Sequence, residues 1–178
     1  MAAGGLGWVL SGREAMAGTA VGVTLPALVR RSSVVAFSRS LEASSRWEEI
    51  GGSRRIVTYQ RVWFDELLVG QPSSQELWVR TLGGRVGDLA QIVHGEAELR
   101  VGDPCLLFVH PGRDGVPVVT ELAQGHYPLR ADGGSFRLHP SPRLGRILAA
   151  DGSAVKALVG RTRAEATSLL EQVGRGAR

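Results

Sequence analysis

Apolar and polar side chains alternate most clearly in residues 56–67, a run rich in β-branched and aromatic types that is typical of a β-strand. One set of alternate residues is mostly aliphatic: Ile56, Thr58, Val62 and Phe64. The other set is amphipathic: Tyr59, Arg61, Trp63 and Asp65. A pleated strand places these sets on opposite faces, so the aliphatic face is expected to join a core. A polar connector at residues 70–75 and a second apolar run at residues 77–82 complete a strand, connector and strand.

The same pattern predicts further strands on both sides of this unit. Residues 33–42 alternate like a strand packed on one face. Residues 105–109 are apolar at both parities, which predicts a central strand covered on both sides. Shorter strands are expected at residues 116–122, 124–129 and 136–139. Residues 46–54 are polar and contain two consecutive glycines, so they are expected to form the turn that enters the central unit.

Helix signals stand at the two ends of the strand-rich region. Thr24 can cap a two-turn helix with Pro26 at its second position. Near the C-terminus, Thr162 and Glu165 form a capping box. Apolar residues then recur at helical spacing as far as Gly174. Residues 141–161, between the strands and this helix, are expected to be a loosely packed connector.

These elements predict a mainly β fold, a small antiparallel OB-like barrel of five or six strands with a short N-terminal helix and a C-terminal helix. A chain of 178 residues that is 43% hydrophobic suits one substantial core. The expected division is a degenerate signal or disordered start at residues 1–23, the β-barrel domain at 24–140, and the connector and C-terminal helix at 141–178.

Gly83, Gly84 and Gly87 form a glycine-dense segment after the second strand of the central unit. The phosphate-binding patterns require either Gly-Lys-Ser/Thr or Gly-x-Gly-x-x-Gly before a helix, and neither is present. Interior glycines also mark bulges and corners of curved sheets, so a tightly bent strand connection is the favoured interpretation.

Charge and reactive side chains narrow the function classes. The positive charge comes almost entirely from arginine. The net charge is +4, and the excess of basic residues lies in residues 1–32 and 141–178, so the expected barrel is close to neutral. Cys105 is the only cysteine, which excludes an intramolecular disulfide, and it lies in an apolar run. The four histidines, His94, His110, His126 and His139, have no metal-binding spacing. The sequence therefore predicts no catalytic residue, no metal and no cofactor, and a non-enzyme is favoured.

Aromatic and arginine side chains interleave on the amphipathic face of the central unit, and this combination suggests binding. The candidate ligand-binding residues are Tyr59, Arg61, Trp63, Trp78 and Arg80. Such a face could stack bases or grip a chain-like ligand. An outer face covered by the terminal helix or by arginine stems would show the same pattern, and that interpretation is favoured.

Residues 1–17 contain a short apolar piece, Leu6 to Leu10, and a small-residue sequence, Ala15-Met-Ala17, that could serve as a cleavage site. No basic residue precedes the apolar piece, so a degenerate or truncated export signal and a disordered start are both kept. A signal predicts a periplasmic or secreted protein, and its absence predicts a cytoplasmic one. No apolar stretch reaches the length of about 20 residues that spans a bilayer.

The succession of motifs resembles a group of uncharacterised exported bacterial proteins with an OB-like or netrin-like β-barrel. The matching motifs lie within residues 24–130: Phe64-Asp-Glu-Leu-Leu-Val-Gly70, Gly83-Gly84, Gly102-Asp with Leu106-Leu-Phe-Val109, and Ala123-Gln-Gly125. Val69 stands where lysine is common in the group, and Asp103 stands where glutamate is common. The resemblance implies a small closed barrel and brings no catalytic residues.

We therefore predict a non-enzymatic envelope or secreted binding module whose partner is a protein or a polymer. One alternative is a nucleic-acid-binding OB-like domain that uses Tyr59, Arg61 and Trp63. A second alternative is a hydrolase in which the fold assembles at least two of the four histidines into one site.

Overall fold

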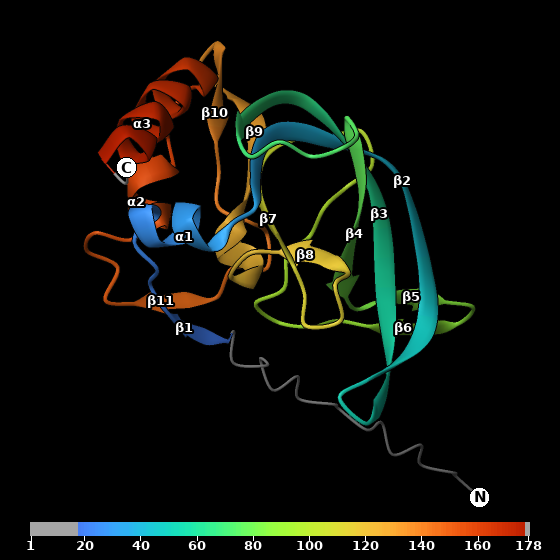
Figure 1. Cartoon of the computed structure of the whole chain (residues 1–178). Coiled ribbons are helices and arrows are strands. Elements are labelled where there is room, and N and C mark those ends of the chain that lie inside the picture. The colour runs from blue at the N-terminus through green and yellow to red at the C-terminus, as the bar shows by residue number, and fades with distance from the viewer. Residues whose placement is uncertain (1–17, 177–178) are drawn as a thin grey trace, which may run out of the picture.

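The computed structural model describes residues 18–176, and the predicted export signal at residues 1–17 lies outside them. The protein is mainly β (Figure 1). The strands are β1 (Thr19–Val21), β2 (Val34–Ile50), β3 (Ser53–Val69), β4 (Glu76–Leu82), β5 (Gly84–Val86), β6 (Leu89–Gln91), β7 (Pro104–Pro111), β8 (Pro117–Val119), β9 (His126–Asp132), β10 (Ser135–Leu138) and β11 (Arg146–Leu148). The helices are α1 (Leu25–Arg31), the short 3-10 helix η1 (Leu122–Gly125), α2 (Ala154–Leu158) and α3 (Arg163–Gly176).

Seven strands form one sheet in the order β10-β9-β7-β2-β3-β4-β8. Because β8 also pairs with β7, the strands β7, β2, β3, β4 and β8 form a ring of five. The pairs around this ring are antiparallel except β4 with β8, which is parallel and consists of the single pair Arg80 and Val118. A ring with an odd number of strands must contain at least one parallel pair. The sheet is therefore mixed and partly closed, whereas an antiparallel arrangement throughout was expected.

The hairpin of β2 and β3 is the longest unit of the fold, with 17 residues in each strand. It turns at Gly51 and Gly52, both with positive φ, and extends well beyond the strands on either side (Figure 1). The predicted turn at residues 46–54 was wrong in extent, because most of those polar residues belong to the two strands. Their side chains interact with one another: Arg46 pairs with Glu48 at 2.6 Å, and the Arg54 guanidinium lies 5.0 Å from the Trp47 ring centre.

Two hydrophobic cores lie on opposite faces of the sheet. The first, between the sheet and the helices, contains Leu28, Phe37, Phe108, Tyr127 and Leu170 among its members. The second, inside the ring, includes side chains of alternate strand residues: Ala36, Val62, Phe64, Leu107 and Val119. The central strand β7 contributes to both cores, which confirms that residues 105–109 are covered on both sides.

The three α-helices gather on one side of the sheet (Figure 1). Thr24 caps α1 by accepting a hydrogen bond from the Ala27 N–H at 3.4 Å, and Pro26 occupies the first turn, as predicted. The capping box at α3 is also confirmed, because the Thr162 N–H donates to Glu165 Oε2 at 2.7 Å. Within residues 18–176, none of the helices combines the length and apolar character needed to cross a membrane.

Two segments carry more structure than the sequence indicated. Residues 141–161, expected to be a loose connector, contain β11 and α2, and Ala154 and Leu158 are fully buried against the helix-side core. Thr19–Val21, within the expected signal or disordered start, form β1, which pairs in parallel with β11. The C-terminal part of the chain therefore holds the start of the described chain in place.

Candidate functional site

The five residues predicted to bind a ligand lie together on the outer surface of β3 and β4. In the register of these strands, Tyr59 is opposite Arg80 and Arg61 is opposite Trp78, while Trp63 follows on β3. We call these five residues the aromatic–arginine face. Trp78 is exposed, with 41% of its surface accessible, and the other four residues are partly buried. The alternation along β3 was thus sufficient to predict that these side chains share a face.

The two arginines of this face and two arginines beside it form ion pairs with carboxylates. Arg61 lies 3.2 Å from Glu42 and 3.4 Å from Glu76. Arg80 lies 2.7 Å from Asp114 and 3.6 Å from Glu48. Two further pairs complete the set: Arg39 with Asp65 and Arg46 with Glu48. Four arginines thus face five carboxylates, and the face carries no excess of positive charge.

Tyr59 is already engaged within this network. Its hydroxyl donates to Glu48 Oε1 at 2.9 Å, and the Arg46 guanidinium lies 4.3 Å from the centre of its ring. A cation in that position covers one face of the ring, the surface that a nucleic-acid base would stack on. Trp78 is therefore the aromatic side chain of the face that is most available to a partner.

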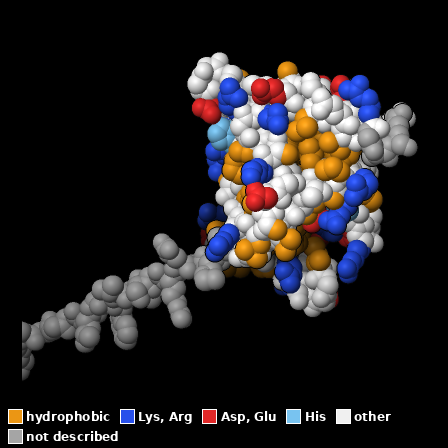
Figure 2. Space-filling view, turned by 90° about the vertical axis from the view of Figure 1, so that its left-hand side faces the viewer, with side chains coloured by type: hydrophobic (Ala, Val, Ile, Leu, Met, Phe, Trp, Pro, Cys, Tyr) orange, Lys and Arg blue, Asp and Glu red, His pale blue; other side chains and the backbone are white. Residues whose placement is uncertain are grey.

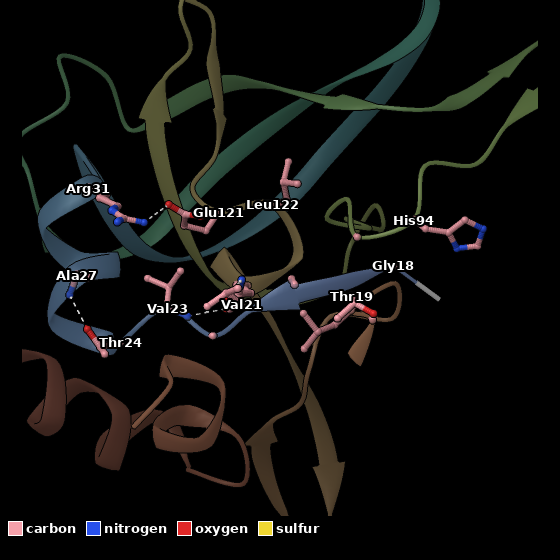
Figure 3. A pocket seen from close by; sticks show the side chains of 16 residues that line it. Gly18, Thr19, Val21, Val23, Thr24, Ala27, Arg31, His94, Glu121 and Leu122 are labelled. Carbon is pink, nitrogen blue, oxygen red and sulfur yellow. Dashed lines mark hydrogen bonds and ion pairs between the residues drawn. The ribbon is translucent and has the colours of Figure 1, made fainter. Parts of the chain in front are cut away.

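A groove beside β1, with a volume of about 610 Å³, is the second candidate site (Figure 3). One wall is the continuous backbone of residues 18–24, and the other includes His94, Glu121, Leu122 and Gln124. Arg31 of α1 and Glu121 form an ion pair at one end, and His94 lies at the other (Figure 3). The sequence did not indicate this groove, because residues 19–21 resemble a glycine-rich start and their strand partner lies more than 120 residues away.

Two consecutive residues of the groove wall have unusual backbone conformations. Glu121 and Leu122 have φ of 55° and 56°, in the left-handed region that non-glycine residues rarely adopt. Such conformations cost on the order of 1 kcal/mol or more each and are found preferentially at functional sites. Leu122 nevertheless remains 49% exposed at the groove, so burial of its side chain does not account for the strain.

Two of the four histidines lie beside hydroxyl groups of other segments. His110 Nδ1 lies 3.2 Å from the Thr120 hydroxyl, and His126 Nδ1 lies 3.0 Å from the Ser141 hydroxyl. Over residues 18–176, no three His, Cys, Asp or Glu side chains are arranged to hold a metal ion. His126 and Ser141 are both only 3% exposed, so a substrate has no access to this serine–histidine pair. The pair instead connects the loop after β10 to β9.

Glu96 is a buried carboxylate that the sequence did not single out. Its two oxygens accept hydrogen bonds from the Leu82 N–H at 3.1 Å and from the Ala97 N–H at 2.9 Å. Burial raises the pKa of Glu96, and these two hydrogen bonds oppose the shift. Because both donors are backbone groups, Glu96 has a structural role: it attaches the segment before β7 to the end of β4.

Cys105 is buried in the ring, where its sulfur lies 3.6 Å from the Ser38 hydroxyl. Burial raises the pKa of the thiol to about 12, so almost none of the reactive thiolate is present at neutral pH. We expect a thiol reagent such as 5,5′-dithiobis(2-nitrobenzoic acid) to leave the native protein unmodified and to label it at once in denaturant. Rapid labelling of the native protein would contradict the buried position.

No protein-family model, curated protein or solved structure matches this chain. The resemblance to exported bacterial β-barrel proteins therefore stays a prediction.

Proposed function

We propose that this chain is a non-enzymatic binding module of the cell envelope or a secreted one, and that the aromatic–arginine face binds a protein partner. The observation that carries the proposal is the exposure of Trp78 between Arg61 and Arg80 on a rigid two-stranded surface. Trp, Tyr and Arg are the residue types most enriched among the side chains that dominate the free energy of protein–protein binding.

The alternative function, a nucleic-acid-binding module built on a closed OB-like barrel, is less well supported by the same face. Nucleic-acid binding requires unneutralised Lys and Arg side chains near the phosphates. Here each arginine of the face already contacts a carboxylate, and Arg46 covers the Tyr59 ring. On the helix-bearing side, basic side chains are scattered among acidic and hydrophobic ones instead of forming one patch (Figure 2).

The proposal is tested with immobilised full-length chain and an extract of the organism that produces it. The immobilised natural sequence is expected to retain partner proteins from the extract. Trp78→Ala removes the exposed anchor, and the amount of these proteins retained is expected to fall at least about tenfold. Phe136→Ala is the matched control, since Phe136 is 62% exposed but lies on β10, away from this face. Equal retention by both variants would contradict the proposal.

A fluorescein-labelled single-stranded oligonucleotide distinguishes the nucleic-acid-binding function from the protein-binding one. Fluorescence anisotropy at low salt is expected to show no binding. If binding is seen, weakens steeply with added salt and is lost in Trp78→Ala, the result would favour nucleic acid over a protein as the partner of this face.

A further inference from the structure

The free edge of β1 has the hydrogen-bonding geometry of an unfilled strand position. In the parallel pair with β11, Gly22 N–H donates to the Leu148 carbonyl at 2.9 Å. Backbone groups of successive strand residues point to opposite sides, so Ala20 and Gly22 face β11. Thr19 and Val21 therefore direct their N–H and C=O groups to the other side, toward the groove.

The side chain of Gln124 forms hydrogen bonds with part of this edge. Its side-chain amide accepts from the Val23 N–H and donates to the Val21 carbonyl, both at 3.0 Å. These are the two hydrogen bonds that the N–H and C=O of one residue in a parallel neighbouring strand make with residues two apart. A side-chain amide of the opposite wall thus fills the first residue position along the edge.

The next equivalent position is free. It consists of the Val21 N–H and the Thr19 carbonyl, which have no hydrogen-bond partner among residues 18–176. Both residues line the groove, so the two groups are available to a ligand that enters it (Figure 3). We propose that the groove binds an extended peptide segment of a partner protein, which adds as a strand to the edge of β1.

Size and charge agree with this ligand. Because Gln124 occupies the edge beside Val23, the open part of the wall is residues 18–21. A strand rises about 3.3 Å per residue, so this part accommodates an extended segment of about four residues, roughly 13 Å long. Among the described residues that line the groove, Arg31 and Glu121 are the only arginine, lysine or carboxylate side chains, and they neutralise each other; His94 lies at the far end. A groove with one internal ion pair and free backbone groups suits a peptide backbone better than an ion.

Side-chain recognition is expected at the two exposed apolar residues of the groove. Val21 is 67% exposed on β1, and Leu122 is 49% exposed on the opposite wall. The left-handed conformations of Glu121 and Leu122 hold this wall in its present shape at a cost in stability. An apolar side chain of the peptide would cover both Val21 and Leu122. This site is separate from the aromatic–arginine face and does not depend on the function proposed for that face.

The test selects peptides from a phage-displayed library of random heptapeptides with the full chain as target. The enriched peptide is then synthesised and titrated into the nitrogen-15-labelled protein. We expect hydrogen exchange of the Val21 amide to slow by at least about tenfold, because it gains a partner. The Gly22 amide is the internal control: it already donates to Leu148, so its exchange rate is expected to stay unchanged.

A substitution in the protein and a chemical modification of the peptide complete the test. Val21→Pro removes the free donor without removing a hydrogen bond present among the described residues, and binding is expected to fall about five- to tenfold. If that variant does not fold, N-methylation of each peptide amide in turn replaces it: methylation of the one amide that donates to the Thr19 carbonyl is expected to weaken binding by a similar factor. The proposal is overturned if no peptide is enriched, if every methylated position is tolerated, or if Trp78→Ala abolishes binding.

Discussion

Gly70→Ala is expected to lower the free energy of unfolding by about 2 to 5 kcal/mol, the combined effect of an unfavourable φ and a steric clash. Gly70 follows β3 with φ +91°, and an alanine Cβ at this position would lie 2.1 Å from the Ser33 carbonyl oxygen. The clashing oxygen belongs to the backbone of Ser33, just before β2, so the clash cannot be relieved by rotating a side chain. Urea unfolding followed by circular dichroism measures the loss.

Gly87→Ala is the matched control for this prediction. Gly87 also has a positive φ, +59°, but nothing lies within 4 Å of the position that a Cβ would take. This substitution adds the conformational strain without the clash, so a loss of about 1 kcal/mol is expected. If the two variants are equally stable, the close approach of Gly70 to Ser33 does not limit this position.

Lowering the pH from 7 to 4 is expected to reduce the free energy of unfolding by about 3 kcal/mol through His126 alone. Burial lowers the pKa of His126 from 6.5 to about 4, with Glu98 opposing the shift and Arg130 adding to it. Between these two values the unfolded chain takes up a proton that the folded protein excludes. The contribution is therefore fully present above pH 6.5 and is lost as the pH falls toward 4.

His126→Gln isolates this effect, since glutamine does not titrate. Other groups change the slope as well: hydrogen bonds and nearby arginines hold the pKa of Glu48, Glu98, Asp114 and Glu165 low, and burial raises that of Glu96. For the first four carboxylates, the folded protein loses stability only as the pH falls below their ordinary pKa values. For Glu96, the folded protein loses stability as the pH rises above the ordinary pKa of a glutamate. In the variant, the urea midpoint is expected to lose its fall toward acidic pH between pH 6.5 and 4.5, and any change left in this window is expected to have the opposite sign, from Glu96. An unchanged slope would show that His126 is accessible to protons in the native state.

The sequence was most informative where one face of a strand is buried. Alternation along residues 56–67 correctly placed Val62 and Phe64 in a core and Tyr59 and Trp63 outside. It could not predict the ion pairs of the outer face, because the partners come from other segments. Asp114 lies in the loop between β7 and β8, and it reaches Arg80 only because β8 closes the ring beside β4.

Local conformation limited the prediction after β7. Residues 116–122 were expected to form one strand, yet β8 contains only Pro117–Val119. Glu121 and Leu122 adopt left-handed conformations although neither is glycine, so their residue types give no sign of the turn. The turn brings Gly125 so close to Thr120 that a Cβ at Gly125 would lie 2.0 Å from the Thr120 carbonyl oxygen.

At the groove, the prediction from sequence was limited because the contacting segments lie far apart along the chain. β1 exists because Arg146–Leu148 pairs with it and because Gln124 binds its other edge. Neither interaction leaves a local pattern in residues 18–24, which are small and weakly apolar. Only the folded arrangement of three distant segments shows that this edge has a free peptide position.

The central strand β7 links the helix layer to the interior of the ring. Leu106 and Phe108 belong to the helix-side core, whereas Cys105, Leu107 and Val109 belong to the ring core. A shift of one residue in its pairing would exchange the two sets and leave neither core filled. The pairing of β7 with β2 and β9 is therefore specified from both faces at once, and the two layers are expected to melt as one cooperative unit.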